Sequence, residues 1–371
     1  MRSHLVLAVA LSLIVTGCIN SIATKFQDNQ CVRNCNGEGS PVLFEQPVLQ
    51  TSQMFVGETS LLFVMLWQKF GVKRDGYELV SGSDNSNKVK LTTRRSYALS
   101  LPAICDICGT TLMNLALTMI PVSIYQMTRG VLILFVALFS IVFLKHKISR
   151  FEWLSLFIVV FGVFLVGYSG QTGVTIDVSL ITGILLIVLA QVCTASQFVI
   201  EEHIMSKWIV TPSTLVAYEG MYGAGITLGA MCLASITVVR GHPDSSFNIV
   251  SSLHDMFANS SVLYSSIIIM TSIACFNFFG ITLTNSMNAT VRSTIDTCRT
   301  LLVWLVSLSL GWESFKFIQF VGFAMLVLGT LLFNGAITVD KNKLPKWLAK
   351  DYPDDQDHRI INVVDEEVER F

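Results

Sequence analysis

Apolar runs of roughly helix-spanning length recur along this chain and constrain its fold more than any other feature. A helix needs about 20 mainly apolar residues to cross the hydrocarbon core of a bilayer. Only helices and closed barrels satisfy their backbone polar groups in lipid, and these runs are too long and continuous for barrel strands. The sequence therefore predicts an all-α polytopic membrane protein with ten transmembrane helices, at residues 4–20, 48–68, 97–119, 121–144, 151–169, 178–200, 214–239, 261–287, 290–311 and 314–338.

The composition agrees with a lipid environment. Charged residues make up only 14% of the 371 residues, and 52% are hydrophobic, whereas a soluble domain carries about 25% charged residues. The formal net charge is −1, which gives no reason to expect nucleic acid or another strongly charged macromolecule as a partner. The bilayer itself and a small-molecule substrate are the partners that this composition favours.

The distribution of positive charge predicts the orientation. When the loops between the segments are assigned alternately to two sides, one side holds 18 Lys and Arg residues and the other holds 4. Lys and Arg prefer the cytoplasmic side of a membrane. Both termini are then expected in the cytosol if the first segment is retained, together with the solvated loop at 70–96 and the polar tail at 340–371.

The first apolar segment has a second interpretation. Met1 and Arg2 precede a short apolar run, as in a signal peptide. Cleavage near Gly17 or Cys18 would leave nine spans without changing the orientation of the others, and Val15-Thr16-Gly17-Cys18 also resembles a bacterial lipoprotein box. The internal repeat described next favours a retained helix.

Three short motifs recur in order at a nearly constant offset. The pattern G-x-T-L-x-N begins at Gly109 and again at Gly280, and Arg129 corresponds to Arg299 in the following segment. Glycine motifs at Gly162 and Gly329 come next in each half. Because five spans is an odd number, a second copy would enter the membrane inverted, as in many secondary transporters. We expect five-helix repeats at 1–170 and 171–339; the alternative is that apolar helices resemble one another by composition.

Ionisable residues inside apolar segments are the candidates for a substrate pathway. Such groups are costly in lipid, so they usually face the interior of a bundle and mark either a pathway or a structural pair. The candidates are Glu58, Asp106, Arg129, Glu219, Arg292, Asp296 and Arg299.

These charges support two readings. Arg292, Asp296 and Arg299 are spaced by four and then three residues, which places them on one helical face. In the functional reading, Arg129 and Arg299 present guanidinium groups to an anionic substrate. In the structural reading, Asp296 neutralises both arginines of its helix and Arg129 pairs with Asp106 or Glu58. Either of those two carboxylates could instead carry a coupling proton.

Nothing in the sequence favours an enzyme or a cofactor. No His lies deep in an apolar segment, and no nucleotide-binding, zinc-protease or hydrolase motif stands in a suitable context. Hence neither a catalytic residue nor a metal site is assigned. Cys31 and Cys35, in a polar loop, could form a disulfide or remain two free thiols. Asn259-Ser-Ser261 matches the N-glycosylation sequon on the non-cytosolic side.

Several further motifs resemble solute carrier family 35, the nucleotide-sugar-transporter-related branch of the drug/metabolite transporter superfamily, and within it the F branch. The motifs are Thr16-Gly-Cys-Ile-Asn20, Met54-Phe-Val-Gly-Glu58, Gln126-Met-Thr-Arg129-Gly130, Asn277-Phe-Phe-Gly280 and Leu310-Gly-Trp-Glu313. The resemblance covers most of the chain. It implies ten spans as five plus five, alternating access, and residence in endomembranes, with the lysosome first and the Golgi, endoplasmic reticulum or mitochondrion as alternatives.

The resulting hypothesis is a secondary transporter of a small polar or anionic metabolite. Its rival is a membrane scaffold that does not transport and acts through a partner protein, for example a mitochondrial carrier. Gly225 and Gly229 form a GxxxG pair of the kind that lets helices approach closely. We expect it to serve packing within the chain; a homodimer seam or a hinge is the alternative.

Overall fold

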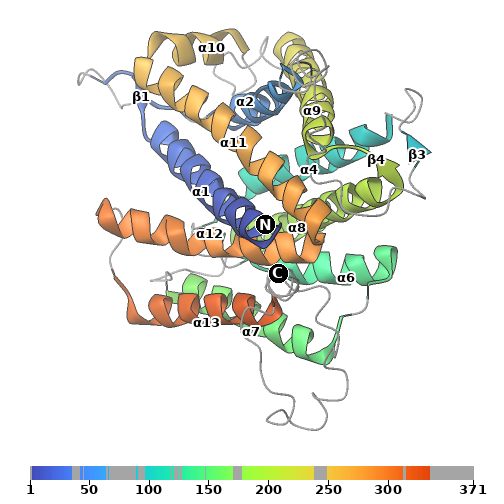
Figure 1. Cartoon of the computed structure of the whole chain (residues 1–371). Coiled ribbons are helices and arrows are strands. Elements are labelled where there is room, and N and C mark those ends of the chain that lie inside the picture. The colour runs from blue at the N-terminus through green and yellow to red at the C-terminus, as the bar shows by residue number, and fades with distance from the viewer. Residues whose placement is uncertain are drawn as a thin grey trace.

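The structure is a computed structural model of the chain, and it forms a bundle of long helices (Figure 1). It describes residues 2–35, 42–44, 46–63, 66, 89–90, 97–117, 119–120, 125, 128–146, 148–169, 178–237, 249–311 and 315–334. The principal helices are α1 (Arg2–Asp28), α2 (Pro47–Thr59), α4 (Ser100–Leu117), α6 (Leu132–Leu144), α7 (Arg150–Ser169), α8 (Val178–Lys207), α9 (Pro212–Thr237), α10 (Ile249–Ala258), α11 (Ser260–Ser286), α12 (Ala289–Ser309) and α13 (Phe317–Phe333).

Each of the ten predicted segments contains one of these helices, with α10 as an addition. Four helices of the described residues are long and apolar enough to cross a membrane, at Leu5–Asp28, Tyr97–Ala116, Val178–Lys207 and Ser260–Ser286. Leu132–Leu144 and Phe317–Phe333 are shorter apolar helices. The protein is therefore a polytopic α-helical membrane protein, while ten crossings stay a prediction.

Several boundaries differ from the prediction because charged residues extend a helix without breaking it. Helix α8 continues to Lys207 rather than ending at residue 200, and α1 continues to Asp28 rather than 20. Four short strands were not predicted: β1 (Cys31–Arg33) pairs antiparallel with β2 (Val42–Leu43), and β3 (Val89–Lys90) pairs parallel with β4 (Trp208–Ile209). The tail at 340–371 and most of the 70–96 loop lie outside the described residues.

The helices pack in matching pairs. Helix α1 lies along α11, and α4 lies along α8 (Figure 1). In the same way, the contact of α1 with α12 matches that of α8 with α6. The contact of α2 with α11 matches that of α9 with α4. Three further contacts, α2 with α9, α6 with α12 and α7 with α13, join the helices that would correspond in two copies of one unit. If α1, α2, α4, α6 and α7 are matched with α8, α9, α11, α12 and α13, every contact that involves one of the first five helices has its counterpart. The contacts of α8 with α11, α8 with α12 and α11 with α12 have no counterpart of the same extent among the described residues of the first half.

Helices α7 and α13 approach each other through glycine. A Cβ on Gly162 would lie 2.6 Å from the carbonyl oxygen of Gly322, and a Cβ on Gly322 would lie 2.7 Å from that of Gly162. The two backbones therefore touch directly, which small residues permit in membrane helices. An apolar cluster that includes Leu156, Trp304 and Leu326 surrounds this contact and ties α7 and α13 to α12.

Helix α9 uses glycine to pack on α2, but not through its GxxxG pair. A Cβ on Gly220 would lie 2.6 Å from both the backbone nitrogen of Thr59 and the Cβ of Glu58, whereas Gly225 and Gly229 have no described atom within 4 Å of such a Cβ. Helix α9 therefore approaches α2 closely at Gly220 and not at Gly225 or Gly229.

We expect Gly220→Val to lower the free energy of unfolding by about 1–3 kcal/mol, because the added side chain would overpack the α2–α9 contact. The matched Gly229→Val change meets open space and should leave stability nearly unchanged. Unfolding of the purified protein in mixed micelles measures both. Equal losses in the two variants would contradict this account of the contact.

Residues 31–35 and α10 lie together at the start of α11 and form a small region that we call the cap. Polar contacts hold this region together. Cys31 and Cys35 are joined by a disulfide with a sulfur–sulfur distance of 2.06 Å, and Arg33 forms an ion pair of 2.6 Å with Asp255 of α10. Asn259 connects the two parts: its side-chain oxygen accepts the backbone N–H of Ser261 at 3.0 Å, and its amide nitrogen donates to the carbonyl of Cys31 at 3.0 Å. Asn259 is thus the N-cap of α11.

Because an N-cap side chain satisfies an otherwise unpaired backbone N–H, we expect Asn259→Ala to lower stability by about 1 kcal/mol. Asn259→Asp retains the accepting oxygen and should keep most of that stability, although it also removes the glycosylation acceptor. Thermal unfolding of the two variants measures how much the Asn259 N-cap contributes to stability. The electrophoretic mobility of Asn259→Asp from cells tests the predicted glycan. If Asn259→Asp is as unstable as Asn259→Ala, the accepting oxygen is not what stabilises α11.

Candidate functional site

Helix α12 carries the charged residues at the centre of the bundle. Its first nine residues, from Ala289 to Thr297, are all buried, and the side chain of Asn288 caps its start by accepting the N–H of Val291 at 2.7 Å. Arg292, Asp296 and Arg299 all point into the protein, with 1%, 8% and 8% of their surface exposed. Since α12 contacts α1, α6, α8, α11 and α13, these side chains can meet charges from much of the chain.

Arg292 forms an ion pair with Glu201 of α8. Both side chains are buried, and the guanidinium carbon lies 3.9 Å from the centroid of the Phe198 ring. Space for Arg292 comes from Gly280 of α11, where a Cβ would lie 2.7 Å from the Nε atom of the arginine. Gly280 begins the second copy of the repeated motif, so that glycine is explained by a side chain from the neighbouring helix.

Three further carboxyl groups gather around this pair. Glu58 of α2 accepts a hydrogen bond of 2.5 Å from Asn277 of α11, and Glu219 of α9 accepts one of 2.9 Å from Gln197 of α8. Asp106 of α4 lies close enough to Gln197 and Glu201 for its carboxyl group to interact with both. The charges of all three interact with Glu201. We call Glu58, Asp106, Glu201 and Glu219 the carboxyl cluster.

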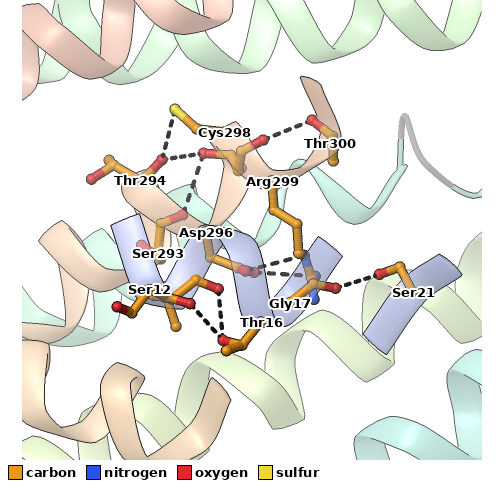
Figure 2. A network of polar contacts seen from close by, with 12 residues as sticks. Ser12, Thr16, Gly17, Ser21, Ser293, Thr294, Asp296, Cys298, Arg299 and Thr300 are labelled. Atoms are coloured by element: carbon orange, nitrogen blue, oxygen red, sulfur yellow. Dashed lines mark hydrogen bonds and ion pairs between the residues drawn. The ribbon is translucent and has the colours of Figure 1, made fainter. Parts of the chain in front are cut away.

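The second group of charges lies two helical turns further along α12. Arg299 faces Asp296, with 3.3 Å between its Nε atom and the Oδ1 atom of the aspartate, and it lies against α1 (Figure 2). A Cβ on Gly17 would lie 2.5 Å from the Cδ atom of Arg299, so the arginine crosses α1 at a position without a side chain. The ring of Phe276 lies 5.1 Å from its guanidinium carbon.

Arg129 belongs to the same group. It lies close enough to Arg299 for the two positive charges to act on each other, and its guanidinium carbon is 6.0 Å from the ring centroid of Tyr125. We call Arg129 and Arg299 the guanidinium pair. Among the described residues, Asp296 is the carboxylate that interacts with it, so positive charge is in excess there.

The structure therefore divides the seven predicted residues between two places. Glu58, Asp106 and Glu219 gather around Arg292. Asp296 and Arg299 lie beside α1, and Arg129 is close enough for its charge to act on Arg299. The expectation that Asp296 would neutralise both arginines of its helix is wrong for Arg292, which turns to Glu201. The charged groups that act on Asp106 and Glu58 include Glu201 and Arg292 and do not include Arg129.

Glu201 is the site residue that the sequence analysis missed. The predicted segment ended at residue 200, because Glu201-Glu202 resembles the polar end of an apolar run. Helix α8 instead continues for seven residues, which carries Glu201 to Arg292 and Glu202 to the start of α12. There Glu202 accepts the backbone N–H of Ala289 at 2.7 Å and lies 3.3 Å from the Nε2 atom of His146. In the part of the chain that is described, no group of His, Cys, Asp and Glu is arranged to hold a metal ion.

The chain is similar to proteins of a known transporter family. The profile of the family described as "Nucleotide-sugar transporter" matches residues 49–205. Solute carrier family 35 member F6 of Homo sapiens is 32% identical over 336 residues, which cover 87% of this chain and 87% of the human protein. The chain belongs to solute carrier family 35.

Other relatives agree with that membership. Solute carrier family 35 member F6 of Mus musculus is 32% identical over 337 residues, covering 87% of both chains. An uncharacterised protein of Schizosaccharomyces pombe is 37% identical over 336 residues, covering 88% of this chain and 96% of its own. A protein crystal structure matches with a TM-score of 0.61 at 13% identity, covering 88% and 94% of the two chains; this likeness concerns the fold alone. The family is one of transporters, which makes an enzyme unlikely.

Proposed function

We propose that this member of solute carrier family 35 is a secondary transporter that moves a small anionic or polar metabolite by alternating access. The guanidinium pair is the observation that carries the proposal. Arg299 lies against α1 with Asp296 beside it, and Arg129 of a separate segment is close enough for its charge to act on Arg299. An anion could therefore neutralise the remaining positive charge. Arginine suits this role because its planar donors match the oxygens of phosphate and carboxylate groups.

We also propose that the two halves, 1–170 and 171–339, are inverted repeats with ten crossings in total. The matched helix contacts support this proposal, because each contact of the first five helices has a counterpart among the second five. Secondary transporters of this construction place substrate between the halves, near the middle of the membrane. Arg129 and Arg299 occupy corresponding places in the two halves, as expected for such a site.

The distribution of Lys and Arg supports an orientation, and the resemblance to solute carrier family 35 supports a compartment. We propose an endomembrane location, the lysosomal membrane first, with both ends of the chain on the cytosolic side. The excess of Lys and Arg in alternate loops supports that orientation. Selective permeabilisation of cells that express the chain with a tag at either end tests it, since both tags should be labelled when only the plasma membrane is opened.

A binding and uptake screen tests the transport function. The purified chain is heated with each of UDP-glucose, GDP-mannose, UMP, GMP and citrate, and the active compounds are then used for uptake into vesicles. A ligand at about 100 times its Kd stabilises the folded state by about 2.7 kcal/mol, which a thermal shift detects. We expect at least one of these anions to shift the melting temperature and to enter vesicles.

Arg33→Gln is the matched control for this screen, because Arg33 lies in the cap with Asp255 rather than in the guanidinium pair. It should respond to the same compounds as the unchanged chain. The proposal is contradicted if the folded protein neither shifts nor transports any anion of the panel.

A further inference from the structure

The carboxyl cluster contains more acid than its one arginine can balance. Glu58, Asp106, Glu201 and Glu219 come from four helices, and Arg292 is the positive group that acts on all four. Two like charges about 6 Å apart repel by about 3 kcal/mol at an effective dielectric constant of about 20. Because Arg292 is already paired with Glu201, ionisation of the other three carboxyl groups would leave them to repel one another.

The neighbours of Glu58 leave room for a proton but suit a metal cation poorly. One oxygen accepts the N–H of Asn277, and Gly220 of α9 packs against its Cβ atom. The charged groups that face it are Asp106 of α4, Glu201 of α8, Glu219 of α9 and Arg292 of α12. Arg292 would repel a metal ion, and the amides of Asn277 and Gln197 already donate to the carboxyl groups of Glu58 and Glu219.

Two buried oxygen atoms in the cluster have no hydrogen-bond partner in the part of the chain that the structure describes. They are the Oε2 atom of Glu58 and the Oε1 atom of Glu201, on side chains with 1% and 0% of their surface exposed. A buried acceptor that lacks a partner costs about 1–3 kcal/mol. A proton on one carboxyl oxygen would convert that acceptor into a donor, and it would remove one negative charge from the cluster.

We propose that the carboxyl cluster is a proton-binding site and that its proton moves together with the anion held by the guanidinium pair. Helix α12 is the mechanical connection. Arg292 and Arg299 are seven residues apart on it, which corresponds to about 10 Å along the helix axis, so a movement of α12 that releases one arginine also displaces the other. The proton-binding part stands by itself, and the coupling rests on the proposed transport function.

Infrared spectroscopy tests the proton site without any substrate. The chain is reconstituted in lipid, and difference spectra are recorded between mildly acidic and mildly alkaline buffer, where a protonated carboxyl group has its own carbonyl band. We expect Glu58→Gln and Glu219→Gln each to lose part of that band, because glutamine keeps the shape of the side chain without binding the proton. Asp255→Asn, in the cap, should leave the intensity from the cluster unchanged. An unchanged band in both glutamine variants, each shown to be folded, would overturn the proposal.

Uptake under a proton gradient tests the coupling, with the panel of anions named above as probes. With the membrane potential held at zero, one proton carried with each anion permits up to about tenfold accumulation per unit of pH difference. Glu58→Gln should lose this accumulation while it still exchanges anion across the membrane. If no anion enters the vesicles, the transport function fails and the infrared result still decides the proton site. If anions enter without any response to the gradient, the coupling is refuted while transport stands.

Discussion

Replacing Arg292 by Leu should lower the free energy of unfolding by about 3–5 kcal/mol, the effect expected when one partner of a buried ion pair is removed. Glu201 would then keep a negative charge inside the bundle, next to three other carboxyl groups. Reversible unfolding in mixed micelles measures the loss. Arg33→Leu is the comparison: Arg33 is 44% exposed and its partner Asp255 is 7% exposed, so this half-buried pair should contribute less than the fully buried pair of Arg292 and Glu201.

A double variant separates the pair from its environment. In Glu201→Leu combined with Arg292→Leu no charge of the pair is left unbalanced, and apolar replacements of buried ion pairs are often close to neutral. We therefore expect the double variant to be more stable than Arg292→Leu alone. If the single and double variants lose the same stability, the ion pair is not what makes Arg292 necessary.

Removing the charge of Arg299 should weaken anion binding by about tenfold to a hundredfold, because a hydrogen bond to a charged group contributes about 1.5–3 kcal/mol. Arg299→Gln is the variant to use, and the Kd of whichever panel anion binds is the quantity to measure. Arg299→Lys should give an intermediate loss, since lysine keeps the charge without the planar donor fork. The melting temperature without ligand shows whether each variant is folded.

Gly17→Ala provides an independent test of the same place. The new methyl group would lie 2.5 Å from the Cδ atom of Arg299, so the guanidinium must move although no charge is lost. We expect weaker anion binding in this variant too. Normal binding in both Gly17→Ala and Arg299→Gln would place the substrate elsewhere.

The sequence predicted which charged residues lie inside the bundle better than it predicted the partners of those residues. Apolar length located all ten helical segments, and Glu58, Arg292 and Arg299 stood out because ionisable groups are rare in such runs. The partner of Arg292 is 91 residues away in the chain. Helical spacing offers only local partners, so it pointed to Asp296, which is correct for Arg299 and wrong for Arg292.

The short strands and the packed face of α9 could not be predicted from residue patterns in the sequence. The four strands are only two or three residues long, and a run that short has no readable alternation. Gly225 and Gly229 have the spacing of a packing motif, yet the packed positions are Gly220 and Gly223. Which face of a helix is covered depends on its neighbours, and those are set by the tertiary fold.

The bare contact between Gly162 and Gly322 has a consequence for motion. Backbones in direct contact leave little free volume between two helices, and the side chains of Leu156 and Leu326 pack around the contact. We expect α7 and α13 to move together as one unit when the bundle changes shape. An alternating-access movement would then take place at other helix contacts.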